Sequence, residues 1–404
     1  MPIDLRFRSD TEVADVEPDE FFGRQLPSLF VERAELLVPA DGLRLRVLVI
    51  DVDDRSWTLR RDDGTYSVAR GAVTDPGRAT ARIRLDRIQL ADLVTDQITP
   101  IGLMTAGALD QTEGQVGHVL DWWLVLRSVL DGRPVHRGTM SDLPDDLHRT
   151  FQPGDDTAEM RDFLERAGYL HIAGLFTAQE MAAVSADMDR AAPTYSEGDG
   201  RSWWATVDDG TPRLVRMQGF DEHSPTAAAL LVDPRLTALS DLPGCGHRHT
   251  GMAGNRLEAL FKPIGVVHGI SDVPWHKDCS LGRHSYDCCN LTLGISVTGG
   301  RRGSGQLRVI AGSHRALVWP ALLDPSTTGL PEVELPTETG DVTIHLSCTL
   351  HMAEPPVESE RRVMYTSLTL PRIGGQAAAA NRARLIASRE KAPHNLADVP
   401  SRVP

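Results

Sequence analysis

The part of the chain between residues 257 and 370 constrains the fold most, because it reads as a series of short strands. Apolar and polar residues alternate over short stretches. Turns rich in Gly, Pro and Asp separate these stretches from one another. This spacing is typical of an all-β sandwich or barrel. The stretches are LEALFKPIG, CCNLTLGISVTG, GQLRVIAGS, GDVTIHLSC and RRVMYTSLTL.

The first third of the chain follows a different pattern. Apolar residues alternate with arginines around residues 43–49 and 81–85, and a further pair of strands is predicted on either side of the Asp63-Gly64 turn. Residues 116–130 then carry apolar side chains at helical spacing. We expect an α+β unit, in which this helix packs on a three- to five-stranded antiparallel sheet.

The length of the chain and one polar segment indicate two domains. Its 404 residues fit about two domains of ~100–200 residues each. The polar, proline-containing segment before Asp156 separates the two patterns. We predict a first domain over 1–135, a linker over 136–156, a second domain over 157–371 and a tail over 372–404. The second domain is expected to open with two capped helices, the second of them starting at the Thr177–Glu180 capping box.

Charge and composition exclude several classes of protein. The net charge of −14 argues against binding to nucleic acid or to an anionic membrane surface. No apolar run approaches the ~20 residues of a membrane span, and the first residues lack the apolar core of a signal peptide, so we expect a cytoplasmic protein. Five cysteines without a CxxC pair indicate reduced thiols, not disulfides or a zinc–thiolate site.

The sharpest local feature is the stretch Trp275-His276-Lys277-Asp278. In a strand, residues i and i+2 face the same side, so His276 and Asp278 would present an imidazole and a carboxylate to one point. A second histidine from a neighbouring strand would complete the two-His, one-carboxylate triad that binds Fe(II) and leaves positions open for other ligands.

Residues 157–371 resemble the phytanoyl-CoA dioxygenase family of Fe(II)/2-oxoglutarate oxygenases. The resemblance rests on five stretches in the family's order: DFLERAGYLHIAGLFTAQEM, WHKD, GSGQLRVIAGSHR, GDVTIHLSCTLH and the arginine pair that opens the last strand. It implies a mainly-β double-stranded β-helix (jelly-roll) domain with flanking helices. It also implies Fe(II), the cosubstrate 2-oxoglutarate and O₂.

The same resemblance assigns candidate site residues. The family's metal ligands fall on His276, Asp278 and His351. Its 2-oxoglutarate arginine, about ten or eleven positions after the distal histidine, falls on Arg362 or on the adjacent Arg361, of which Arg362 fits better. Only one of the two can point inward from an alternating strand.

Other positions near these motifs receive weaker assignments. Lys262 and Asn290 are further candidates for contacting the cosubstrate. Ala353 departs from the family, which often has a small hydroxylated residue there. We interpret His345 as a core or surface histidine, and Cys288 with its neighbour Cys289 as core or near-site thiols.

The resemblance implies hydroxylation of a small organic or lipid-like metabolite, with decarboxylation of 2-oxoglutarate to succinate. The carboxylate at Asp278 sets the chain apart from related halogenases, which have a small residue there. Desaturation, cyclisation or epimerisation at the same iron remain alternatives, as does a ligand-binding protein on a degenerate oxygenase scaffold.

Three arginines could contact the substrate. Either they meet an acidic group of the substrate or they are solvated; they are Arg201, Arg213 and Arg216. The oligomeric state is left open.

Residues from about 20 to 135 resemble the sterol carrier protein 2 family. The resemblance rests on the strand spacing and on residues 71–96 and 97–114. It implies an α/β layer around an apolar tunnel for a lipid or an acyl chain. The alternative, which we favour, is a packing or dimerisation module without a tunnel.

Overall fold

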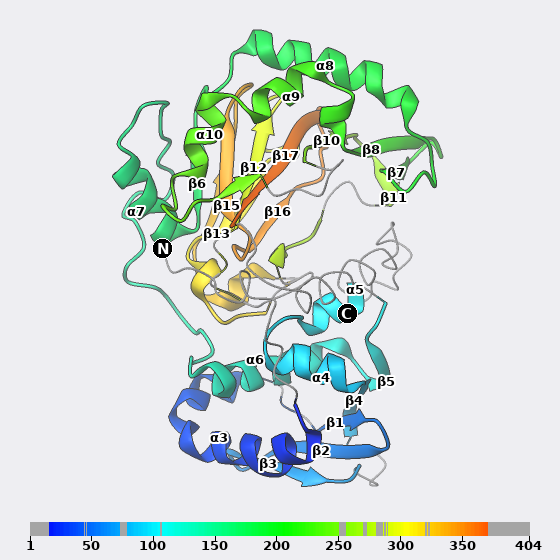
Figure 1. Ribbon diagram of the computed structural model, residues 1–404, viewed down its shortest axis with the longest axis vertical. Helices are drawn as coiled ribbons and strands as arrows, with labels where there is room; N and C mark the ends of the chain where they lie inside the picture. The colour runs from blue at the N-terminus through cyan, green and yellow to red at the C-terminus, as the bar shows by residue number, and fades with distance from the viewer. Residues whose placement is uncertain are drawn as a thin grey trace.

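The structure is a computed structural model that describes residues 16–43, 45, 47–72, 79–105, 107–249, 256–269, 273–279, 286, 288, 290–319, 321 and 324–370. Figure 1 shows two bodies joined by an extended segment, with the first part of the chain below and the larger β-rich part above. Each body has its own hydrophobic core. Cys289 and the predicted tail over 372–404 lie outside the described residues.

The first body is a mixed sheet covered by helices. Its strands are β1 (Val47–Val52), β2 (Arg55–Asp62), β3 (Thr65–Arg70), β4 (Ala79–Leu85) and β5 (Asp110–Gly114), in the order β3-β2-β1-β4-β5. Its helices are α2 (Pro18–Glu20), α3 (Leu26–Glu32), α4 (Arg87–Val94), α5 (Pro100–Thr105) and α6 (Val116–Asp131), with a π-helical turn at Phe21–Gln25 and a 3₁₀ stretch at Ala34–Gly42.

One expectation for this sheet is wrong. It is not wholly antiparallel, because β4 lies beside β1 and runs parallel to it. The first three strands form an antiparallel meander, and the chain then crosses back to the free edge of β1. The apolar helix predicted over 116–130 is confirmed as α6, whose Trp122 and Trp123 are buried in the core.

The second body has two antiparallel sheets and a set of helices. The larger sheet has the order β11-β7-β8-β10-β17-β12-β15-β6, with β9 beside β17, and the smaller has the order β14-β13-β16. The strands are β6 (Tyr169–Ile172), β7 (Ser202–Val207), β8 (Pro212–Gln218), β9 (Arg248–His249), β10 (Glu258–Lys262), β11 (Val266–His268), β12 (Leu291–Ser296), β13 (Leu307–Ile310), β14 (Glu332–Leu335), β15 (Val342–Leu346), β16 (His351–Ala353) and β17 (Arg361–Thr369).

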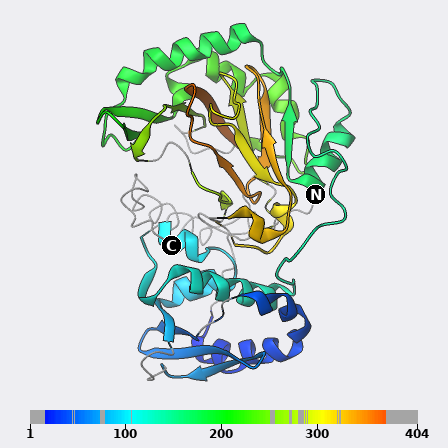
Figure 2. The same ribbon diagram turned by 180° about the vertical axis from the view of Figure 1, so that it is seen from behind.

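Helices flank the larger sheet at the end of this body farthest from the first body and along one side, where α7 lies (Figures 1 and 2). They are α7 (Thr157–Ala167), α8 (Ala178–Ala191), α9 (Pro225–Leu231) and α10 (Pro234–Ser240), with short 3₁₀ turns at Ala192–Thr194, Phe220–Glu222, Ser313–Arg315 and Pro325–Thr328. The predicted helix starts are confirmed. The Asp156 side chain caps α7, and Thr177 and Glu180 form the capping box of α8. Gly168 ends α7 in the left-handed region, at φ 90°.

The two bodies meet through α6. The indole Nε1 of Trp319 donates to the Asp121 carboxylate (3.1 Å), and the Tyr286 hydroxyl donates to that of Asp131 (2.5 Å). Leu317 and Tyr286 belong to the same hydrophobic cluster as the core of the first body. The first body therefore packs against the parts of the β-rich body that contain Tyr286, Leu317 and Trp319.

The capping box yields a stability prediction. Thr177→Ala removes the side-chain acceptor for the Glu180 backbone N–H and should lower the free energy of unfolding by about 1 kcal/mol. Thr237→Ala is the control, since that hydroxyl contacts only the Pro234 carbonyl within α10, and should change it by less than about 0.5 kcal/mol. Denaturant midpoints of the full chain measure both. Equal midpoints for the two variants would contradict the capping role.

Candidate functional site

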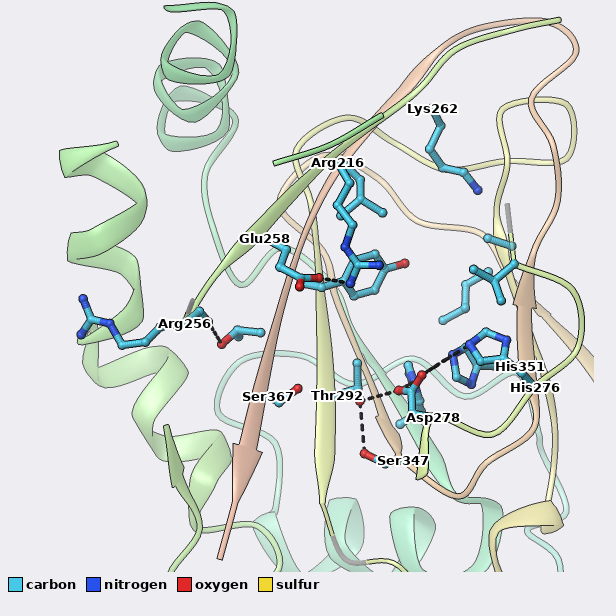
Figure 3. Close-up of a pocket in the computed structure, with 17 residues that line it drawn as sticks. Arg216, Arg256, Glu258, Lys262, His276, Asp278, Thr292, Ser347, His351 and Ser367 are labelled. Carbon is cyan, nitrogen blue, oxygen red and sulfur yellow. Dashed lines mark hydrogen bonds and ion pairs between the residues drawn. The ribbon is translucent and has the colours of Figure 1, made fainter. Parts of the chain in front are cut away.

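The structure brings His276, Asp278 and His351 together. One possible ligand atom from each lies within 4.8 Å of the others. The Asp278 Oδ1 atom is 3.4 Å from His276 Nε2 and 3.6 Å from His351 Nε2. Figure 3 shows the two imidazoles and the carboxylate pointing toward one another at one end of a pocket.

Backbone pairing positions the two histidines. His276 and His351 exchange backbone hydrogen bonds of 3.1 and 3.0 Å, and their ring centroids lie 4.3 Å apart. His351 belongs to β16, but His276 forms only isolated bridges, so the expected strand at WHKD is wrong. The extended pairing at His276 still directs this side chain and that of Asp278 to one side.

Hydrogen bonds fix the orientation of both rings. His276 Nδ1 donates to the Pro274 carbonyl (2.7 Å), and His351 Nδ1 donates to the Thr349 carbonyl (2.9 Å). A neutral imidazole that donates through Nδ1 keeps its lone pair on Nε2. Both Nε2 atoms therefore carry a lone pair on the side that faces Asp278, which is how metal-binding histidines are commonly held.

Side chains on β12 and β15 contact the second carboxylate oxygen of Asp278, Oδ2. Thr292 Oγ1 donates to Oδ2 at 2.9 Å, and His345 Nε2 lies 3.4 Å from the same atom. Burial disfavours the charged carboxylate, but the imidazoles of His351, His276 and His345 outweigh it and hold the pKa of Asp278 well below its usual value.

Burial, together with the neighbouring imidazoles, also lowers the pKa of His351 well below its usual value. An ionised carboxylate and a neutral imidazole are the forms that bind metals. The donor set of two imidazole nitrogens and one carboxylate oxygen thus fits a divalent iron site with open positions.

A pocket of about 420 Å³ extends from this cluster between the two sheets. Its wall includes residues of β10, β12, β15 and β17 from the larger sheet and of β13 and β16 from the smaller one. Three basic side chains, Lys262, Arg216 and Arg256, contribute to the lining, together with the acidic side chains of Glu258 and Asp278. The other lining residues are Leu260, Val273, His276, Thr292, Leu307, His345, Ser347, His351, Ala353, Tyr365, Thr366 and Ser367.

The comparison with protein families bears on this geometry. Residues 164–363 match the model of the family described as phytanoyl-CoA dioxygenase (PhyH). This part of the chain belongs to the phytanoyl-CoA dioxygenase family. Members of that family are Fe(II)/2-oxoglutarate-dependent oxygenases that use O₂, and the chain is an enzyme of this class.

Several solved structures are similar to the chain. AviO1 from Streptomyces viridochromogenes Tue57 is 22% identical over 54% of this chain and 96% of its own, with a TM-score of 0.44. The α-ketoglutarate-dependent epimerase SnoN from nogalamycin biosynthesis is 21% identical over 53% and 80%, with a TM-score of 0.42. EctD from S. alaskensis, with 2-oxoglutarate and 5-hydroxyectoine, is 16% identical over 57% and 83%, also with a TM-score of 0.42. Among curated proteins, none matches.

Arg362, the preferred candidate for the cosubstrate arginine, does not fit. Its guanidinium donates to the carbonyl and hydroxyl oxygens of Ser185 (both 2.9 Å) and pairs with Asp189 (2.7 Å) on α8. Arg361 lies on the opposite face of β17, the face that carries Tyr365 and Ser367 into the pocket. The one-residue difference reverses the side chain's direction, because side chains alternate along a strand.

Lys262 lines the pocket, and Arg361, which is not itself among the lining residues, lies beside it. They are register partners on β17 and β10, and both are 2% exposed. The Arg361 Nη1 atom donates to the Gly305 carbonyl (2.6 Å), and a Cβ built on Gly305 would lie 3.4 Å from Lys262 Nζ. Two cationic groups thus meet beside the same glycine.

Asn290, the other predicted cosubstrate contact, is not among the pocket-lining residues. It is buried next to Cys288 and Ser347. Ala353 does line the pocket, beside Leu307. Of the three arginines singled out in the sequence, only Arg216 reaches the pocket.

His345 was misjudged from sequence alone. It was interpreted as a core or surface histidine, but it is buried and lines the pocket. Strand β15 carries Ile344 and Leu346 into the core, so His345 and Ser347 face the other side. The alternation of apolar and polar residues along β15 could have identified His345 and Ser347 from the sequence. The same alternation along β12 could have identified Thr292.

In the part of the chain that the structure describes, no helix has the length and apolar character needed to cross a bilayer.

The Thr292 contact yields a prediction for metal affinity. Thr292→Val removes the hydroxyl that holds Asp278 Oδ2 and should weaken Fe(II) binding about tenfold, as loss of such a supporting hydrogen bond does in other metal sites. Thr366→Val is the matched control, because Thr366 lines the same pocket but donates to the Arg256 carbonyl. Competition with a chromogenic chelator measures both affinities. Equal affinities for the two variants would contradict the role of Thr292.

Proposed function

We propose that His276 Nε2, His351 Nε2 and Asp278 Oδ1 bind the catalytic Fe(II). The observation that carries this proposal is the convergence of these three donors on the wall of the pocket, with both imidazoles held in the tautomer that a metal requires. Two-His, one-carboxylate sites leave positions open for a cosubstrate and O₂.

We propose further that 2-oxoglutarate lies between this site and the pair Lys262 and Arg361. Its keto-acid end would face the metal, and its far carboxylate would meet the two cations near Gly305. An arginine fork matches a carboxylate bidentately. Leu307 and Ala353 supply an apolar wall between the two ends.

The proposed reaction is hydroxylation of a small organic metabolite. When bound, Fe(II) with 2-oxoglutarate and O₂ supplies the oxidising chemistry, in which 2-oxoglutarate becomes succinate and CO₂. The chain's own residues orient both substrates and restrict water at the buried end of the pocket. The alternatives of desaturation, cyclisation and epimerisation use the same centre, and product mass or stereochemistry distinguishes them.

The remaining pocket favours a substrate with polar groups over a purely apolar lipid. Arg216 and Glu258 form an ion pair on its wall, and Tyr365, Thr366 and Ser367 add hydroxyls. Arg201 and Arg213 have partners elsewhere, in His223 and Glu360.

The finer fold assignments belong to the same proposal. The facing antiparallel sheets support a double-stranded β-helix over residues 157–371, after a linker over 136–156. The first body, within residues 1–135, is proposed to be a sterol-carrier-like domain. Its cavity is apolar but only about 40 Å³ in volume, which supports the packing alternative over an open lipid tunnel.

Removing a ligand tests the iron assignment. His276→Ala and Asp278→Ala should each lose bound iron and, with it, the visible absorption band that Fe(II) and 2-oxoglutarate give together without O₂. His268→Ala, an exposed histidine on β11, is the control and should keep both. Anaerobic absorption spectra and iron analysis provide the readout. The assignment would be wrong if the alanine variants kept the band.

The adjacent arginines allow a matched test of cosubstrate binding. Arg361→Ala should raise the 2-oxoglutarate concentration for half-maximal succinate release about tenfold or more, since a charge-assisted contact contributes about 1.5–3 kcal/mol. Arg361→Lys should fall between it and the wild type. Arg362→Ala, which breaks the contacts with Ser185 and Asp189 on α8, should change this concentration less than about twofold. The reverse ranking would restore Arg362 as the cosubstrate arginine.

A further inference from the structure

Three cysteines from separate segments converge beside the triad. The Sγ atoms of Cys279, Cys288 and Cys348 all lie within 4.8 Å of one another. Cys288 and Cys348 are 2% and 0% exposed, and Cys279 is half-buried. From the sequence we expect no thiolate metal site, because the chain has no CxxC pair. The cluster arises only when the tertiary fold brings the three segments together.

The cluster lies where the segments of the proposed iron site meet. Cys279 directly follows Asp278, and Cys348 lies shortly before His351. Cys288 precedes β12, the strand of Thr292. Two backbone hydrogen bonds cross this junction: the Cys279 N–H donates to the Ser347 carbonyl (3.1 Å), and the Ser347 N–H donates to the Asn290 carbonyl (2.9 Å).

The spacing of the sulfurs suits one metal ion. A zinc–thiolate bond is about 2.3 Å long, so three thiolates around one ion lie about 3.8–4.0 Å apart. This separation is within the 4.8 Å limit that the three sulfurs satisfy. Sulfur ligands select soft ions such as Zn²⁺ or Cu⁺ over ions that prefer oxygen.

One sulfur also has a supporting hydrogen bond. The backbone N–H of Asn290 donates to Cys288 Sγ at 3.4 Å. Hydrogen bonds of this kind stabilise negative charge on metal-bound sulfur. The contact is independent of the clustering of the three cysteines and points to the same chemistry.

We propose that Cys279, Cys288 and Cys348 bind one thiophilic metal ion, distinct from the catalytic iron, and that this ion links the segments that carry the iron ligands. Binding forms three metal–sulfur bonds and releases the thiol protons to solvent, without oxidation or reduction. The proposal does not depend on the activity of the iron site, because it concerns a different donor set.

Cobalt titration of the full-length protein tests this proposal. Metal-free protein, kept reduced and anaerobic, should develop the intense near-ultraviolet charge-transfer band of thiolate-bound Co²⁺. His276→Ala should show the same band, although it lacks a ligand of the proposed iron site. Cys288→Ser and Cys348→Ser should each lose most of the band. Cys245→Ser is the control, because Cys245 lies apart, with its Sγ donating to the Pro243 carbonyl, and it should keep the full band.

Metal analysis of the wild-type protein as purified should find zinc or copper in addition to iron. Whichever of these two metals is found is the natural ion of the cysteine site. Absence of the thiolate band in the wild type would overturn the proposal, whether or not the cysteine variants fold. So would a band that survives in both folded variants, as judged by circular dichroism. A disulfide between two of the three cysteines in the purified protein would also overturn it. If His276→Ala loses iron but retains the thiolate band, the cysteine site and the proposed iron site are shown to bind metal independently.

Discussion

The pairing of His276 with His351 is the interaction on which the site depends. Two backbone hydrogen bonds join these residues, although only one of them belongs to a regular strand. The pairing places both imidazoles on the same side of the backbone. Lys277, between the first histidine and Asp278, is buried on the other side, where its Nζ donates to the Ala316 carbonyl (3.1 Å). The alternation then returns Asp278 to the site.

This arrangement links the site to the rest of the chain. Ala316 leads into Leu317, whose carbonyl accepts from the backbone N–H of His136 at the start of the linker, and into Trp319, which donates to Asp121 on α6 of the first body. Tyr286, in the segment between Asp278 and β12, contacts the same helix. The first body thus packs against chain segments that adjoin the proposed iron ligands. Its small cavity and these contacts together agree better with a supporting role than with lipid transport.

Much of this organisation was predictable from local sequence. The caps at Asp156 and Thr177 depend on contacts within a few residues, and the helix over 116–130 follows from its apolar spacing. The convergence of His276 and Asp278 needed only an extended backbone. These features require no knowledge of which strands are neighbours.

The features that sequence reasoning missed depend on register and tertiary pairing. The choice between Arg361 and Arg362 depends on a one-residue register between β17 and β10, which sets the direction of each side chain. The parallel pairing of β1 with β4 depends on sheet order. His345 and the cysteine cluster become recognisable only once β15 lies beside β12 and the turn after β15 reaches Asp278.

A crystal structure of the anaerobic protein with Fe(II) and 2-oxoglutarate tests the central claim most directly. We expect iron bound by His276 Nε2, His351 Nε2 and one oxygen of Asp278, with the far carboxylate of 2-oxoglutarate at Arg361 and Lys262. Iron bound by His345 in place of one of these ligands, or a cosubstrate carboxylate paired with Arg362, would contradict it.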